Sequence, residues 1–277
     1  MQFVKAIQTL AFGSLGAGVI NFSSISITAR LLEPEHFGSY ATFASLVTII
    51  SVFSTLRADV FICQRRSLKR AELFFKISLF FVIIFTLLSF VLLTLYGKYI
   101  FDEKNSSVFT YFLLSISILM LGSFQASLST SLHRKDYKLI AKVRFFQAFI
   151  GGVIQVSVAI LSNNSMLALI LGFLVNQGVG GIFLVPITYF RITRKKIAEC
   201  KWLLLNYRKK LVSSSLSCFL LILSPMLPVI FISNNLGTLE AGFFYFAIQI
   251  TTIPFTFVRR ILANIAMAEV STISTLS

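Results

Sequence analysis

Residues 77–97 form the run Ile-Ser-Leu-Phe-Phe-Val-Ile-Ile-Phe-Thr-Leu-Leu-Ser-Phe-Val-Leu-Leu-Thr-Leu-Tyr-Gly, which contains no charged residue. An α-helix of about 20 residues crosses the ~30 Å hydrocarbon core of a bilayer, because each residue adds ~1.5 Å to its length. The run therefore predicts a transmembrane helix. Seven further uncharged, apolar runs predict helices of the same kind: residues 6–29, 37–56, 108–132, 145–161, 166–190, 211–232 and 241–258.

The composition points to the same class of protein. Charged residues make up 13% of the 277 residues and hydrophobic residues 56%, with a mean hydropathy of +0.86. A soluble domain carries about 25% charged residues, because its surface faces water. We therefore predict an all-α membrane protein with about eight transmembrane helices. The net charge of +15 does not indicate a nucleic-acid partner, because the basic residues lie in loops between apolar runs rather than on one helix face.

The basic residues also predict the orientation of the chain. Cytoplasmic loops are enriched in Lys and Arg. If the N-terminus is cytoplasmic, the eight-helix pattern places all of the 25 basic residues on the cytoplasmic side except Arg30, Lys98 and Lys104. Residues 191–210 are then the most basic cytoplasmic loop. Both termini are predicted to lie in the cytoplasm, and residues 162–165, Ser-Asn-Asn-Ser, are predicted to form a tight turn on the other side.

Two segments of the sequence resemble each other. Aligning Gly38 with Gly242 also pairs Leu32 with Leu236 and Tyr40 with Phe244. Six predicted helices separate the two segments, and an even number gives both the same orientation in the membrane, as in a parallel repeat. We therefore predict one complete six-helix bundle in residues 1–200 and the first two helices of a second bundle in residues 201–277.

The sequence shows no arrangement that predicts catalysis or metal binding. The two histidines, His36 and His133, lie far apart, and the three cysteines lack the spacing of metal ligands. The carboxylates lie almost all in loops, and no phosphate-binding loop precedes a lysine. We expect a membrane transporter rather than an enzyme, with no cofactor and no metal.

Three segments carry a family resemblance. Residues 29–40, Ala-Arg-Leu-Leu-Glu-Pro-Glu-His-Phe-Gly-Ser-Tyr, and residues 54–59, Ser-Thr-Leu-Arg-Ala-Asp, resemble motifs of bacterial O-antigen and capsular polysaccharide flippases. These belong to the multidrug/oligosaccharidyl-lipid/polysaccharide exporter superfamily. Residues 227–245 are similar to the start of that family's second lobe, so the resemblance covers essentially the whole chain.

The resemblance implies two six-helix bundles that form a V around a central cavity. It also implies transport of a polyprenyl-diphosphate-linked oligosaccharide from the cytoplasmic to the periplasmic leaflet. Family members usually have more than eight helices, so the resemblance implies a chain that is truncated at its C-terminus.

A diphosphate crosses hydrocarbon only when cations in a wet cavity face it, and arginine suits it because its planar fork binds two oxygens. The resemblance implies that Arg57 contacts the diphosphate and that Asp59 holds Arg57. Arg30, at the end of the first predicted helix, is a further candidate for substrate binding. The alternative for each arginine is an ordinary anchor at the membrane interface.

Amide side chains inside the predicted helices are the second group of candidates. An amide in hydrocarbon requires a partner, so these residues are predicted to face the interior of the bundle. There they make either sugar contacts or hydrogen bonds between helices. They are Asn21, Gln125, Gln147, Asn176 and Gln177, with Gln155 and Gln249 as further members.

The predicted function is that of a flippase in the bacterial inner membrane, which moves its lipid-linked substrate by alternating access. The polysaccharide polymerase and the chain-length regulator of the same pathway are candidate partners, beside the bilayer itself. A cation-coupled exporter of the same fold is an alternative, although no predicted span has an acidic residue in its interior. A membrane-bound glycosyltransferase or polymerase is disfavoured by the short outside loops, and an inactive truncated flippase is the remaining alternative.

Overall fold

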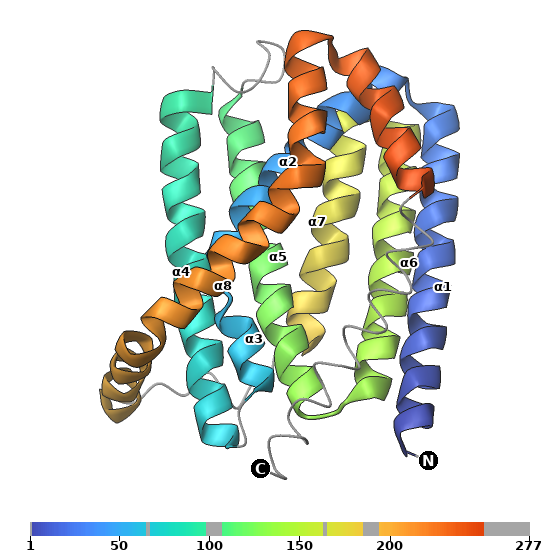
Figure 1. The fold of residues 1–277 in the computed structure, drawn as a ribbon. Helices are drawn as coiled ribbons and strands as arrows, with labels where there is room; N and C mark the ends of the chain where they lie inside the picture. The colour runs from blue at the N-terminus through green and yellow to red at the C-terminus, as the bar shows by residue number, and fades with distance from the viewer. Residues whose placement is uncertain (1, 65–66, 98–106, 163–164, 185–193, 252–277) are drawn as a thin grey trace.

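The computed structural model describes residues 2–64, 67–97, 107–162, 165–184 and 194–251 (Figure 1). These residues are almost entirely helical. The helices are α1 (Gln2–Leu31), α2 (Pro34–Ser54), α3 (Ala58–Cys63), α4 (Leu68–Tyr96), α5 (Val108–His133), α6 (Tyr137–Leu161), α7 (Ser165–Leu184) and α8 (Arg194–Asn235). Residues 238–251 form a further helical segment.

The transmembrane prediction is confirmed. Within the described residues, 7 helices are long and apolar enough to cross a membrane, and each contains or overlaps one of the first seven predicted spans. The eighth predicted span, residues 241–258, overlaps the helical segment 238–251, and its remainder lies outside the described residues, as do residues 185–190 of the sixth. The protein is an all-α membrane protein of about eight membrane helices.

Two elements differ from the prediction. The short helix α3 lies where a loop was expected. Residues 191–210, predicted as a basic loop, are helical from Arg194 onward, because α8 begins there and continues to Asn235. Residues 194–224 contain no Gly or Pro, and their Lys, Arg and Leu residues favour a helix. The predicted boundary between residues 200 and 201 therefore falls inside a helix.

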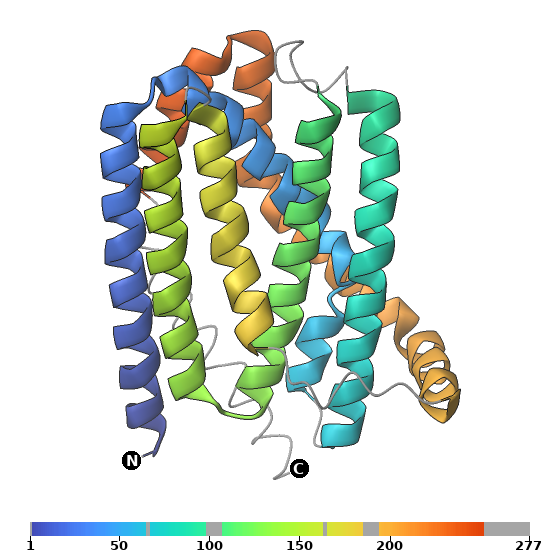
Figure 2. The same ribbon diagram turned by 180° about the vertical axis from the view of Figure 1, so that it is seen from behind.

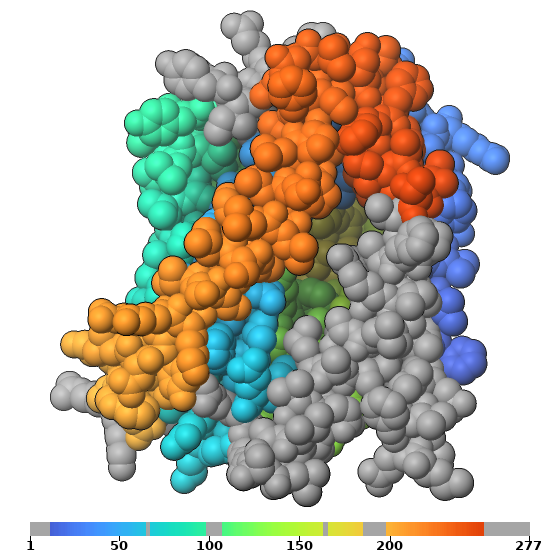
Figure 3. Space-filling view, in the orientation of Figure 1, coloured from blue at the N-terminus to red at the C-terminus, as the bar shows by residue number. Residues whose placement is uncertain are grey.

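The helices form two layers. From behind, α1, α6, α7, α5 and α4 stand side by side in one curved row (Figure 2). The second helix, α2, crosses the other face of this row and packs on α5, α4 and α7. On the outer side of α2 lies α8, which runs obliquely across the molecule and covers much of this face (Figures 1 and 3).

Small residues permit this close packing around α2. Its buried positions include Gly38, Ala41, Ser45 and several other Ser and Thr residues. In a membrane, helices associate through close backbone approach, and small side chains allow it. Several of the hydroxyl groups need no partner on another helix, because they donate to carbonyl groups about one turn earlier on α2, as Thr42 does to Gly38 at 3.1 Å.

The two ends of the molecule differ in charge. One end holds the start of α1, the end of α3, the α5–α6 connection and the starts of α4 and α8 (Figure 1). We call it the basic end, because exposed cations gather there: Lys69, Arg70, Lys135, Lys138, Lys142, Arg208 and Lys209. The opposite end, which we call the far end, holds the α1–α2 and α6–α7 connections and the turn between α8 and residues 238–251.

Candidate functional site

The backbone takes an uncommon course between α2 and α3. Leu56 and Arg57 are consecutive residues with positive φ, at 47° and 54°. Each costs roughly 1–2 kcal/mol in this left-handed conformation, because the Cβ crowds the carbonyl oxygen. Such strain persists only where surrounding contacts hold it, and it concentrates at functional sites. The break ends α2 and makes Arg57 the N-cap of α3.

Arg57 is half-buried at this break. Its backbone N–H donates to the hydroxyl of Thr55 at 3.3 Å. Its side-chain Nε is buried and has no hydrogen-bond partner among the described residues. A buried donor without a partner costs about 1–3 kcal/mol, so this position favours an acceptor brought from outside.

Asp59 lies one helical turn after Thr55, in the first turn of α3. Its side chain is 5% exposed, and its Oδ1 accepts a hydrogen bond from the Thr55 hydroxyl at 2.9 Å. Within the described chain, neither Asp59 nor Arg57 forms an ion pair. The structure thus places the two predicted residues at one break, but the hydrogen bond to the carboxylate comes from Thr55 and not from Arg57.

Arg30 lies apart from this group. It is exposed in the last turn of α1, at the far end of the molecule. Arg57 follows the opposite end of α2, a helix of 21 residues, and therefore lies about 30 Å from the far end at a rise of ~1.5 Å per residue. The two arginines do not belong to one site in this structure.

Three of the predicted amides form a cluster where α1, α6 and α7 meet. The Gln147 side chain is 3% exposed, and its amide donates to the backbone carbonyl of Asn176 at 2.7 Å. The Asn176 amide donates in turn to the Asn21 side chain at 3.4 Å. A second bridge joins Gln155 of α6 to Thr28 of α1 at 3.1 Å. These bonds connect neighbouring helices, while Gln125 on α5 and Gln177 on α7 are half-buried outside the cluster.

The amide cluster depends on Gly180 of α7, and its replacement by alanine is expected to lower thermal stability. The new Cβ would overlap the Gln147 amide and lie 2.6 Å from Phe124 Cδ2. Overpacking of this kind costs about 1–3 kcal/mol. The loss should appear in thermal denaturation of the purified protein, and Gly180→Ala/Gln147→Ala should recover part of it.

The matched control is Gly178→Ala on the same helix. Its Cβ meets only the flexible end of Met120, with Sδ at 3.2 Å. Equal melting temperatures for the Gly180 and Gly178 variants would contradict the packing assigned to the amide cluster.

The two repeat segments meet at the far end. A Cβ at Gly38 would overlap the carbonyl oxygen of Thr238, and a Cβ at Gly242 would overlap the carbonyl oxygen of Pro34. In the alignment of Gly38 with Gly242, Pro34 is equivalent to Thr238, so each contact is the repeat-related copy of the other. Two-fold related segments produce such reciprocal contacts.

Aromatic contacts extend this reciprocal contact. The rings of Phe37 and Phe246 have centroids 4.5 Å apart, and those of Tyr40 and Tyr245 are 5.9 Å apart. Phe37 is 1% exposed and Ala241 is 0% exposed. The starts of α2 and of residues 238–251 are therefore packed tightly together at the far end.

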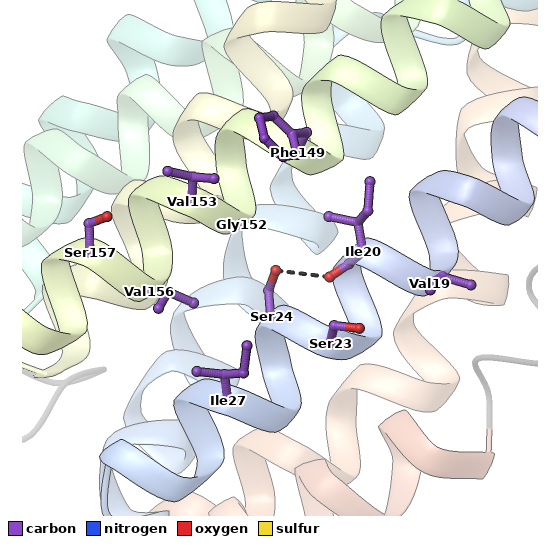
Figure 4. Close-up of a pocket in the computed structure, with 10 residues that line it drawn as sticks. All are labelled: Val19, Ile20, Ser23, Ser24, Ile27, Phe149, Gly152, Val153, Val156 and Ser157. Carbon is purple, nitrogen blue, oxygen red and sulfur yellow. Dashed lines mark hydrogen bonds between the residues drawn. The ribbon is translucent and has the colours of Figure 1, made fainter.

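A shallow groove of about 390 Å³ lies between α1 and α6 (Figure 4). Its walls are mainly aliphatic and aromatic, and the Ser24 hydroxyl at its edge donates to the carbonyl of Ile20 at 2.8 Å. None of the predicted site residues lines it. The groove suits a hydrocarbon chain rather than a diphosphate.

Sequence reasoning assigned no role to Thr55. Its spacing of four residues from Asp59 is the only signal that could have identified it. In the described part of the chain, no group of His, Cys, Asp and Glu residues is arranged to hold a metal ion.

The comparisons with known proteins identify a family but no individual relative. No curated protein and no solved structure matches the chain. The family model described as "Polysaccharide biosynthesis protein" matches residues 27–275, a range that includes α2, the break at Arg57 and the second repeat segment. The chain therefore belongs to the polysaccharide biosynthesis protein family.

Proposed function

We propose that this protein is a flippase that moves a polyprenyl-diphosphate-linked oligosaccharide across the bacterial inner membrane. The substrate is an O-antigen or capsule repeat unit, taken from the cytoplasmic leaflet and released into the periplasmic leaflet. Membership of the polysaccharide biosynthesis family and the long apolar helices support this proposal. The protein acts as a transporter and not as an enzyme, and it works beside the polymerase and the chain-length regulator of its pathway.

The observation that carries the proposal is the state of Arg57. Its guanidinium group lies half-buried near apolar helices. Its Nε–H is buried and donates a hydrogen bond to none of the described residues. A diphosphate oxygen supplies the missing acceptor, and the guanidinium supplies the charge that the anion needs. The strained backbone at Leu56 and Arg57 holds the side chain at this point.

The far-end contact is consistent with alternating access. Gly38 and Gly242 let the two repeat segments close against each other at one end of the molecule. A cycle that exposes the substrate first at the basic end and then at the far end requires this contact to form and to break. The basic end faces the cytoplasm in this proposal, because cytoplasmic loops are enriched in basic residues.

Complementation tests the function directly. The chain is expressed in a strain that lacks its O-antigen flippase, and surface polysaccharide is measured on a gel. Restored polysaccharide is the expected result. The protein's presence in the membrane is checked by immunoblot, and its presence there without any polysaccharide would contradict the proposal.

The proposed orientation predicts which cysteines are reached from outside the cell. After replacement of the native Cys63, Cys200 and Cys218 by alanine, Ser107→Cys should react with a membrane-impermeant maleimide in intact cells. Ser107 is exposed at the start of α5, at the far end. Lys138→Cys, which is exposed at the basic end, should react only after permeabilisation. The reverse pattern would place the basic end outside.

A cation-coupled exporter of the same fold is the second candidate. The observation that favours it is Asp59, a carboxylate that is 5% exposed and forms no ion pair within the described chain. A buried carboxylate of this kind is a suitable place for a coupling proton or sodium ion. Drug export that requires Asp59, in a strain whose polysaccharide is not restored, would support this alternative.

A further inference from the structure

The first part of α8 is an amphipathic helix attached to the basic end of the bundle. Residues 198–210, which we call the basic segment, pack one face on α3 and α4 through the buried Leu203. Tyr207 contacts the rings of Phe61 and Phe74, with centroids 6.0 and 5.7 Å away. These contacts fix the segment beside the bundle, where it projects at the lower left of Figure 3.

The opposite face of the basic segment combines apolar and basic side chains. Trp202 is 59% exposed and Leu205 is 52% exposed. They lie three residues apart and therefore share one face of the helix, with Lys209 one turn further on. Lys201 and Arg208 are exposed along the flank of this face, and Glu199 is the one acidic residue of the segment.

This combination fits the boundary between lipid and water. Tryptophan prefers the headgroup region of a bilayer, where its ring is partly dehydrated and its N–H still finds an acceptor. Lysine and arginine beside it reach the phosphate groups of lipids, and they favour lipids with a net negative charge. The segment packs on the beginning of α4 (Figure 1), whose first turn carries the exposed Lys69 and Arg70. Cations at the end of a membrane helix lie at the level of the headgroups.

We propose that the basic segment binds anionic glycerophospholipids in the leaflet at the basic end. Trp202 and Leu205 enter the headgroup boundary, while Lys201, Arg208 and Lys209 pair with lipid phosphates. The bound lipids hold the beginning of α8, the helix that crosses α2 and leads to the far-end contact. The identification of this leaflet as cytoplasmic rests on the proposed function, but the lipid binding itself does not.

Trp202 is the only tryptophan of the chain, so its fluorescence reports on this site alone. The full chain is reconstituted in nanodiscs of phosphatidylcholine with a minor fraction of phosphatidylglycerol. Bromine, which quenches tryptophan, is placed on the acyl chains of one lipid or of the other. We expect several-fold stronger quenching per brominated phosphatidylglycerol than per brominated phosphatidylcholine, because the anionic lipid is enriched beside Trp202.

The triple variant Lys201→Gln/Arg208→Gln/Lys209→Gln should lose this preference. The matched control is Lys135→Gln/Lys138→Gln/Lys142→Gln, which removes three exposed cations from the α5–α6 region of the same end and should keep it. Equal quenching by the two lipids in the unmodified protein overturns the proposal, as does a preference that survives in the first triple variant. The measurement needs no transport, so its failure is distinguishable from failure of the flippase proposal.

Discussion

Alanine at Gly38 or at Gly242 is expected to reduce polysaccharide export about tenfold or more. The added Cβ would overlap a backbone carbonyl oxygen in each case, of Thr238 or of Pro34. A backbone atom cannot rotate away as a side chain can, so the two helix starts must separate. Overpacking costs about 1–3 kcal/mol, and ~1.4 kcal/mol corresponds to tenfold in an equilibrium. Because the contacts are reciprocal, the two variants should be impaired alike.

A cysteine at Ala241 measures the separation without reference to transport. Ala241 is 0% exposed beside Gly242. In a protein without the native cysteines, Ala241→Cys should react slowly with a maleimide, and Gly38→Ala should accelerate the reaction. Gly178→Ala, whose Cβ meets only the end of Met120, should change neither the reaction rate nor export. An unchanged rate in Gly38→Ala would show that the far-end contact tolerates a side chain.

The sequence was sufficient to predict the membrane spans. Long uncharged runs have one physical solution in a bilayer, because every backbone polar group must be satisfied within a helix. The alignment of Gly38 with Gly242 was weak as a sequence match, yet the same two glycines meet in space. Each glycine is needed because a Cβ would not fit at the contact, so the two positions could be aligned in the sequence before the contact was known.

The sequence was insufficient to predict features that depend on how the helices pack against one another. Nothing in Leu56-Arg57 indicates two left-handed residues, since neither is Gly or Asn, the types that favour this conformation. Likewise, the amides of Asn21, Gln147 and Asn176 were known to require partners, but which helices stand side by side is set by the whole bundle. The basic charges that marked residues 191–210 as a loop gave no information on whether that segment is helical.

Removal of the Arg57 side chain is expected to have the clearest effect on transport. A hydrogen bond to a charged group contributes about 1.5–3 kcal/mol, so Arg57→Ala should reduce export roughly ten- to hundredfold. Arg57→Lys should recover only part of the activity, because an ammonium group lacks the planar fork that binds two phosphate oxygens. Arg70→Ala, which removes one exposed cation from α4 at the basic end, is the matched control and should leave export unchanged.

Arg57→Gly separates the role of the side chain from the strain of the backbone. Glycine adopts the φ of 54° at this position without the steric cost of roughly 1–2 kcal/mol that a Cβ brings. The variant should therefore melt at a higher temperature than Arg57→Ala, measured on purified protein, and export as little polysaccharide. If the guanidinium served only to anchor the helix at the interface, Arg57→Lys, which keeps a cation there, should instead restore export fully. Export as low as that of Arg57→Ala, together with a higher melting temperature than that variant, is the combination expected of Arg57→Gly if the residue is held in a strained conformation to bind its ligand.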